Sequence, residues 1–558
     1  MAKTSADSKD SGRGMNLVRK WIPLVVMSLA LAIIIIDTTL LNVSFGVIIR
    51  DLHTSLQSLQ WVITAYALTL TALTITGGRL GDIFGRRRFF MLGAAIFAVG
   101  SFTASISHSV PTLLLGESII EGIGAAMMLP ATASLLVSTY KGRDRAIAFG
   151  FWGGVAGAAS AVGPILGGWL TSAYSWRWGF RINVAVAALL IIGALIFIRE
   201  VRDTEERPTI DWGGVLLSTL GLLSLVFGII ESSTYGWWKA KAVFTAFGHN
   251  YALHGYSVTP FGLAIGVIFL AAFFIWEQKM EQAGRTPLVS LKLFMNRQFS
   301  SGVATLAVVS LGLTGLIFIL PIFFQGVRRL DAFHTGISLL PLSISLFVAS
   351  PVSVFLTKWL TPKRIIQIGL FFTVLANYAL YHNLNPTATA ADLALGLILF
   401  GAGMGFVQSQ IANLTLSAVS VQQAGEASGV NNTGRQLGSS LGSAIIGAVM
   451  LTKLLTGING GIAKSAVLPA SIKAPVTAAA NAQLPAIEFG SGLKLGQSVT
   501  PEVAQEVRTI SDKATTDAGK NALLWSLGFA ALSLLISFSL PNIQNVDTGQ
   551  SAAPKAGH

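Results

Sequence analysis

The chain has 558 residues, of which 52% are hydrophobic and 11% are charged, and its long apolar blocks exclude an ordinary soluble domain and indicate an integral membrane protein. The net charge is +13, but the basic residues lie between the apolar blocks and form no continuous stripe, which excludes a nucleic-acid partner. The chain has no cysteine, which excludes disulfides and cysteine-based metal sites.

Fourteen segments are apolar and long enough, or nearly so, to cross about 30 Å of hydrocarbon, which predicts an all-α membrane fold. The first apolar run follows a polar, basic tail and is too long for the core of a signal peptide, so we interpret it as a retained span. The predicted spans are 22–47, 61–78, 89–106, 111–137, 146–170, 180–198, 212–230, 261–276, 303–324, 336–356, 365–380, 393–416, 429–451 and 522–540.

The distribution of basic residues predicts the orientation of these spans. An even number of spans places both termini on one side, and short loops rich in Lys and Arg stay in the cytoplasm. With both termini inside, the cytoplasmic loops receive the clusters Arg86-Arg87-Arg88, Lys141-Arg143-Arg145 and Lys363-Arg364. We therefore expect a multi-pass protein with two cytoplasmic ends.

An internal repeat predicts the domain organisation. LGDIFGRRRFFMLGA and LTKWLTPKRIIQIGL, aligned at Leu80 and Leu356, both place a basic turn before a new apolar helix. This predicts six-helix bundles at 22–198 and 300–541, a linker with two inserted spans at 199–299, and tails at 1–21 and 542–558. The second bundle includes a long loop, 452–521, which we expect to form an outer cap or hairpin with part disorder and which could dock a periplasmic adaptor protein.

Several motifs resemble those of a known family. GRLGDIFGRR at residues 78–87 is similar to the G-x-L-a-D-r-x-G-r-k signature of the major facilitator superfamily, and GPILGG at 163–168 is similar to its antiporter motif G-P-x-x-G-G. IDTTLLNV, SWRWGFRINV and GEASGVNNTGRQLG agree further. Together with fourteen spans, they resemble the drug:proton antiporter branch. The resemblance implies a major facilitator fold in the bacterial cytoplasmic (inner) membrane, with two six-helix bundles and two inserted helices.

The signature implies a cytoplasmic gate. Glycines permit a tight turn and close helix approach, the acid can face the positive N-terminal end of a neighbouring helix, and the arginines can reach carboxylates or lipid phosphates. Such a cluster would hold two helix ends together in one conformation. In the alternative interpretation the arginines only anchor the topology. The predicted gate residues are Gly78, Asp82, Gly85, Arg86 and Arg87.

Three acids inside predicted spans are the candidates for proton and substrate coupling. An acid at the centre of a span costs about 2.5–3.5 kcal/mol to insert, so Asp37, Glu117 and Glu121 each require a functional explanation. At 1.5 Å per residue all three fall at a similar depth, and the two glutamates share a helix face. For Asp37 the alternative is an acid that packs between helices and is satisfied by Thr38, Thr39 or Asn42. For Glu117 the alternative is a side chain that reaches interfacial water.

The fourth span departs from the family pattern R-x-x-Q-G-x-G. It reads SIIEGIG, so Ser118 replaces the arginine that the family uses in proton relay, and Glu121 replaces the glutamine. Arg181 also stands where the family has an apolar residue, and it could pair with an acid or anchor the sixth span at the surface. These changes leave the fold prediction intact.

Two further residue sets complete the predicted machinery. Glycines and a proline in the fifth span form a flat, kinkable surface that suits either a hinge or plain close packing. The family architecture would line a central cavity with apolar, aromatic and amide side chains suited to an amphipathic solute. The hinge residues are Gly163, Pro164, Gly167 and Gly168, and the cavity candidates are Phe318, Gln325, Phe406 and Gln408.

The sequence therefore predicts a secondary active efflux transporter, not an enzyme, that exchanges protons for amphipathic, cationic compounds and needs no cofactor. No phosphate-binding loop, nucleophile elbow or metal-ligand spacing is present. Two alternatives stay open: an exporter of a lipid or endogenous metabolite, and a non-transporting membrane sensor on the same scaffold.

Overall fold

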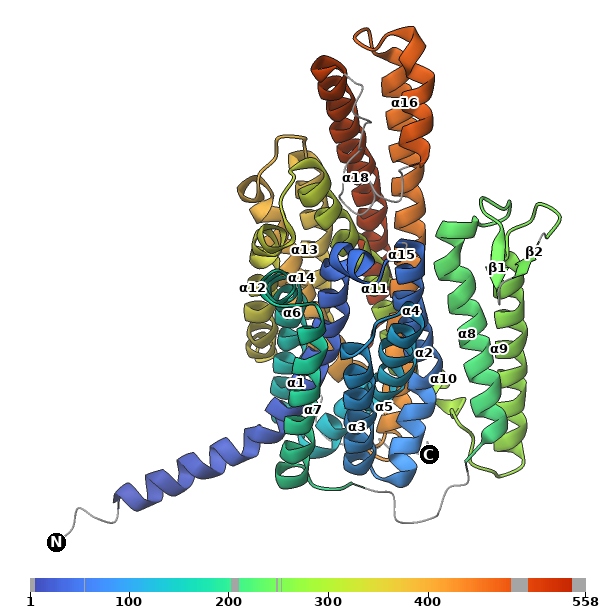
Figure 1. Cartoon of the computed structure of the whole chain (residues 1–558). Coiled ribbons are helices and arrows are strands. Elements are labelled where there is room, and N and C mark those ends of the chain that lie inside the picture. Colours follow the sequence, from blue (N-terminus) through green and yellow to red (C-terminus); the bar gives the residue numbers. More distant parts are fainter. Residues whose placement is uncertain are drawn as a thin grey trace.

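The computed structural model describes residues 6–54, 56–201, 210–246, 249–251, 253–482 and 500–543. Most of the described chain forms long helices that run side by side (Figure 1). Thirteen helices are long and apolar enough to cross a membrane, and the shorter apolar stretch Leu340–Leu356 brings the described set to the predicted fourteen. The fold is therefore the predicted all-α membrane bundle, with one small outer hairpin of strands β1 (Phe244–Ala246) and β2 (His249–Tyr251).

The first bundle contains the first six spans, and the fourth span is divided into three elements. Gly85 separates the second and third spans with φ 104°, a left-handed conformation that glycine adopts without steric cost. The elements are α1 (Ala6–Asp51), α2 (Leu56–Phe84), α3 (Arg86–Ser105), α4 (Val110–Leu113), the π-helix η1 (Leu114–Glu121), α5 (Gly122–Thr139), α6 (Gly142–Ala173) and α7 (Arg177–Phe197).

The inserted pair and the second bundle follow. Side-chain oxygens of Asn296, Asp331 and Thr361 cap the first turns of three helices and fix where they begin. The inserted pair is α8 (Trp212–Tyr235) and α9 (Thr259–Gln282), and the remaining elements are α10 (Lys292–Met295), α11 (Arg297–Ile322), the π-helix η2 (Phe323–Val327), α12 (Ala332–Leu356), α13 (Pro362–Asn383), α14 (Ala390–Leu416), α15 (Ala424–Lys464), α16 (Ala470–Ala482) and α18 (Pro501–Ser537).

Equivalent glycine crossings relate the two bundles. Gly93 of α3 packs against the backbone of Gly124 in α5, and Gly369 of α13 packs against the backbone of Gly403 in α14. Gly93 and Gly369 are separated by the same number of residues as Leu80 and Leu356. Because a Cβ at either crossing would meet backbone atoms, both helix pairs depend on glycine for their close approach. These matched contacts support the proposed duplication.

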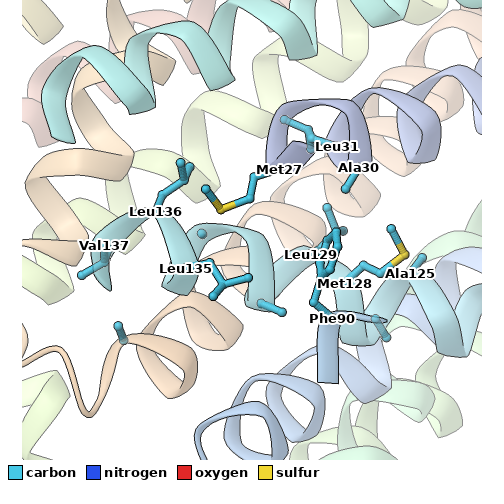
Figure 2. Packing of buried hydrophobic residues seen from close by; sticks show 14 of the residues in the cluster. Met27, Ala30, Leu31, Phe90, Ala125, Met128, Leu129, Leu135, Leu136 and Val137 are labelled. Carbon is cyan, nitrogen blue, oxygen red and sulfur yellow. The ribbon is translucent and has the colours of Figure 1, made fainter. Parts of the chain in front are cut away.

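Apolar packing holds α1, α3 and α5 together in the first bundle. Figure 2 shows side chains from these three helices meeting in one cluster. Close packing of this kind gives van der Waals contact that lipid chains alone do not supply. The labelled residues are Met27, Ala30, Leu31, Phe90, Ala125, Met128, Leu129, Leu135, Leu136 and Val137.

The described part of the predicted loop 452–521 is largely helical. Beyond the predicted end of its span at residue 451, α15 continues to Lys464, and α18 begins at Pro501. With α16 they extend beyond the other helices (Figure 1), and Ser465 donates a hydrogen bond to Glu506 between α15 and α18 at 2.7 Å. The helix therefore continues beyond the predicted end of the span at 451, and that end of the span stays a prediction.

Some predictions fall outside the described residues. These are residues 1–5 and 544–558 of the predicted tails, 202–209 of the linker and 483–499 of the predicted loop. The side chains of Asn42 and Phe318 are also outside the described set, although their backbones lie in α1 and α11.

Candidate functional site

Three carboxyl groups lie together inside the first bundle. Asp37 comes from α1, and Glu117 and Glu121 come from η1. Their exposed fractions are 2%, 1% and 0%. One oxygen atom of each lies within 4.8 Å of the others. The structure thus brings together all three predicted coupling residues, which we call the carboxyl cluster.

A single amide bridges two members of the carboxyl cluster. Asn183 of α7 donates its Nδ2 to Asp37 Oδ1 at 2.6 Å and to Glu121 Oε1 at 3.3 Å. The second oxygen of each carboxyl group has no hydrogen-bond partner among the described residues. Because like charges this close repel and have lost their hydration, the cluster favours binding of a proton or another cation.

The local backbone explains why the two glutamates face α1. In a π-helix the hydrogen bonds run from i to i+5, so the turn is wider than in an α-helix, and such segments are frequent at functional sites. Ser118 of η1 donates its hydroxyl to the carbonyl of Val62 in α2 at 2.6 Å. The residue that replaces the family arginine therefore ties η1 to α2.

Close packing on the other side of η1 fixes the position of Glu121. Gly100 of α3 leaves no room for a Cβ beside the backbone of Glu121. The next residue, Gly122, packs against Thr69 and Tyr66 of α2. Tyr66 is 4% exposed, and its hydroxyl has no partner among the described residues.

Asn183 and Tyr66 also belong to this site and were not predicted from the sequence. Asn183 had a usable signal, because it is an amide in an otherwise apolar stretch of α7. The geometry also bears on the alternatives for Asp37 and Glu117. The hydroxyls of Thr38 and Thr39 donate hydrogen bonds to carbonyls of α1 itself. Glu117 is buried rather than interfacial.

A second charged group joins the two bundles where α2 meets α15, and we call it the Asp82 latch. The Asp82 carboxylate accepts hydrogen bonds from the backbone N–H groups of Gly425 and Glu426 at 3.2 and 3.0 Å, at the N-terminal end of α15. These unpaired N–H groups and the helix dipole favour an anion at this position. Gly78 lies against the carbonyl of Gly425.

Arg86 completes the Asp82 latch. Its Nε and Nη2 atoms lie 2.8 and 2.7 Å from Asp82 Oδ1. The same guanidinium donates to the carbonyls of Val421 and Gln422, just before α15, and to that of Ser134 in α5. One arginine thus contacts both bundles.

The other two predicted gate residues contact the first bundle. Arg87 donates its backbone N–H to Glu200 at 3.0 Å and its guanidinium to the carbonyl of Ile198, after α7. Gly85 lies against the Glu200 carboxylate, where a Cβ would be 2.8 Å from an oxygen. Both residues therefore fix the start of α3 to the end of α7.

The predicted hinge residues lie where α6 meets α1 and α12. Gly163 lies against Thr39 and Gly167 against Leu40, so α6 approaches α1 more closely than a residue with a Cβ would allow. Pro164 lies near Gly336 at the start of α12, and Gly168 is half-buried on the same helix. This is close packing between α6 and its neighbours, and hinge motion at these positions stays a prediction.

The cavity candidates are dispersed. Phe406 of α14 is 8% exposed and packs with Phe372 at a ring distance of 6.0 Å. Gln408 lies beside Gly153 of α6, at the contact between the bundles, and Gln325 is half-buried in η2. Arg181 is exposed, and its guanidinium lies 5.1 Å from the ring of Trp178.

Comparisons with known proteins agree with this architecture. The sequence pattern of the Major Facilitator Superfamily matches residues 27–443. A puromycin resistance protein of Streptomyces alboniger is 30% identical over 75% of this chain and 80% of its own length. A tetracenomycin C resistance and export protein of Streptomyces glaucescens is 28% identical over 75% of this chain and 74% of its own length.

Among solved structures, the human organic anion transporter MFSD10 superposes with a TM-score of 0.55 and 12% identity, covering 93% of this chain and 99% of that one. At this identity the likeness shows the fold alone. The sequence relatives indicate the branch of the superfamily, because they are drug resistance and export proteins of bacteria. The chain therefore belongs to the major facilitator superfamily, a family of membrane transporters and not enzymes, in its fourteen-span drug-resistance branch.

Proposed function

We propose that the protein is a secondary active multidrug exporter that exchanges protons for amphipathic, cationic organic compounds by alternating access. The observation that carries this proposal is the carboxyl cluster. Among the described residues no Lys, Arg or His forms an ion pair with Asp37, Glu117 or Glu121. Three buried acids without a counter-ion favour either bound protons or a bound cation. Competition for one site links the release of protons to the binding of substrate.

The Asp82 latch supplies the second requirement, a gate that opens and closes. Its hydrogen bonds join α2 of one bundle to α15 of the other, and they depend on an exact approach between Gly78 and Gly425. A rotation of one bundle against the other breaks them together. In our proposal the latch closes the cytoplasmic side while the substrate leaves from the other side.

We propose a location in the bacterial cytoplasmic membrane with both termini inside. Lys363 at the start of α13 donates to the carbonyl of Phe538 after α18, so the end of the last span lies with a predicted cytoplasmic cluster. The extension formed by α15, α16 and α18 then faces the outside (Figure 1), where a periplasmic adaptor protein could dock.

The test is transport by the purified protein in proteoliposomes that carry a pH gradient, with ethidium as the amphipathic cation. We expect ethidium uptake to follow the gradient. Asp37→Asn, Glu117→Gln and Glu121→Gln are tested separately, and at least one should lose uptake driven by pH while it retains exchange of ethidium for ethidium. Asp331→Asn, an exposed acid that caps α12, is the matched control and should transport as the parent protein does.

Each other outcome has a defined meaning. If all three neutral variants keep full coupling, the assignment of the carboxyl cluster is wrong. Transport that ignores pH would favour an exporter of lipids or metabolites that runs down a gradient, and the absence of movement would favour a sensor.

A further inference from the structure

A basic residue with a single neutral partner lies in the first third of α15. Arg435 is half-buried, and its Nη2 donates to Asn432 Oδ1 at 3.3 Å, which is the one acceptor within hydrogen-bonding distance among the described residues. A guanidinium has five N–H donors and stays charged. Because an arginine within a membrane span is costly, this one requires a functional explanation.

The internal repeat shows which face of α15 carries Arg435. Four glycine pairs have one constant separation along the chain, and each member of a pair contacts the equivalent neighbour. The first two glycines of α6 meet α12, and their equivalents in α15 meet α2. The last two glycines of α6 meet α1, and their equivalents in α15 meet α11. The pairs are Gly150 and Gly425, Gly154 and Gly429, Gly163 and Gly438, and Gly167 and Gly442.

The same separation places Arg435 on the face that meets the opposite bundle. Gly153 of α6 lies across the contact between the bundles from α14. A Cβ at this position would be 3.5 Å from the backbone nitrogen of Ser409 in α14. Its equivalent in α15 is Ser428. Arg435 follows Ser428 by two helical turns and so lies on the same face. α15 packs against α5 of the first bundle, as this equivalence requires.

Arg435 also lies at the depth of the carboxyl cluster. Gly78 and Gly425 touch at the Asp82 latch and provide a common origin. From there, Arg435 is about 15 Å along α15, and Tyr66, which packs beside Gly122, is about 18 Å along α2. A cation of the second bundle thus lies at about the same depth as three acids inside the first bundle, and no ion pair joins them among the described residues.

The surroundings of Arg435 provide further polar groups. Asn431 precedes Arg435 by one turn, and its Oδ1 has no partner among the described residues. Asn431 is buried, whereas Thr433, whose Oγ1 also has no partner among the described residues, lies on another face of the helix. Buried polar atoms without partners are uncommon and mark places where a ligand or water completes the hydrogen bonds.

We propose that Arg435 binds a carboxylate or similar acidic oxygen group of the transported compound and thereby extends the substrates to amphipathic acids and zwitterions. This inference rests on the proposed export function. The planar guanidinium fits a carboxylate in a bidentate manner, which a neutral amide wall does not provide. In a zwitterion, Arg435 binds the acidic end.

The test uses rhodamine 110, which has a free carboxyl group, and rhodamine 123, its methyl ester. Both are measured by fluorescence in proteoliposomes with a pH gradient, using the full chain. Arg435→Gln should raise the KM for rhodamine 110 by about tenfold or more relative to the KM for rhodamine 123. Arg435→Lys keeps the charge without the bidentate geometry, so its selective effect should be smaller. Arg285→Gln, which removes an exposed arginine, is the control.

The outcomes separate this inference from the proposed function. Equal changes for both dyes in the Gln and Lys variants would mean that Arg435 supports the fold or acts through the carboxyl cluster, and the inference is then wrong. It is also wrong if the parent protein exports the ester and not the acid, or if neither variant changes the ratio. If the parent protein moves neither dye, the proposed multidrug export itself fails. Should the Gln variant not fold, as judged by thermal melting, the Lys variant decides.

Discussion

The two bundles differ at one equivalent place in their interiors. In the first bundle this place holds the carboxyl cluster. In the second it holds a small pocket lined by residues that include Thr373, Asn377, Phe400 and Ser526. Glu121 precedes the glycine crossing at Gly124 by three residues, and Phe400 precedes the equivalent Gly403 by three.

The second bundle has neutral side chains at this place. Ser101 and Asn377 are related by the separation that relates Leu80 to Leu356, and Asn377 is fully buried with an unpartnered Oδ1. Its amide donates to the carbonyl of Thr373 at 2.8 Å. The comparison teaches that the repeated backbone does not require charge at this place, which supports the coupling role that we propose for the acids of the first bundle.

The strongest way to break the comparison is to place an acid in the second bundle. Phe400→Glu removes a buried aromatic ring and introduces a carboxyl group with no cluster to share its proton, so the free energy of unfolding should fall by about 3–5 kcal/mol. Thermal melting in detergent measures the loss. Phe400→Leu is the control for lost volume and should cost about 1 kcal/mol. Equal melting of the Glu variant and the parent protein would show that the two interiors are interchangeable.

A substitution in the Asp82 latch should have a smaller effect, on the opening of the gate. It compares residues that bridge the two bundles with residues that do not. Asp82→Asn loses the charge-assisted bonds to α15 and Arg86, so the gate should open more often. Because the chain has no cysteine, Ser134→Cys can report access to the gate. Its labelling by a water-soluble maleimide should accelerate about tenfold with Asp82→Asn.

Arg87→Gln is the matched control for the latch. It removes a charge from the same turn, but Arg87 contacts Glu200 and Ile198 of the first bundle. Labelling of the added cysteine should therefore change by less than about twofold. Equal acceleration by both substitutions would contradict the division of the signature into bridging and anchoring residues.

The smallest effect concerns a charged contact within the first bundle. Asp51 accepts from Trp176 Nε1 at 3.0 Å and pairs with Arg177, and these two contacts lower the pKa of its carboxyl group. Stability from a lowered pKa is present above the unfolded value and is lost as the pH falls through the folded value. Asp51→Asn should cost less than about 1 kcal/mol at pH 7, because the pair is partly exposed.

The pH dependence checks the sign of that last effect. Melting temperatures of the parent protein and Asp51→Asn should differ at pH 7 and converge as the pH falls toward 3. A difference that grows on acidification would mean that Asp51 does not stabilise the fold as an anion.

The architecture could be predicted from the sequence because the membrane spans and the repeat both have local sequence patterns. Apolar length indicates the helices, and the turn containing Asp82 identifies the repeat. The depth of Asp37, Glu117 and Glu121 followed from counting residues along two helices. Asn183 was harder to predict, because its role depends on where α7 lies against α1 and η1, which no local pattern contains.

Two other features required coordinates. The π-helix η1 has no local sequence signal that separates it from an α-helix, although it contains both glutamates. The signature turn also divides its arginines: Arg86 contacts both bundles, whereas Arg87 contacts Glu200, and their adjacent positions in sequence do not reveal this.

One continuous helix has a mechanical consequence. The 41 residues of α15 span about 60 Å, with the Asp82 latch at one end, Arg435 about a quarter of the way along and the extension at the other end. With the proposed gate, a pull on the tip of the extension is transmitted along this one helix to the Asp82 latch. An antibody fragment bound to the extension would therefore slow the transport cycle without occupying the path of the substrate.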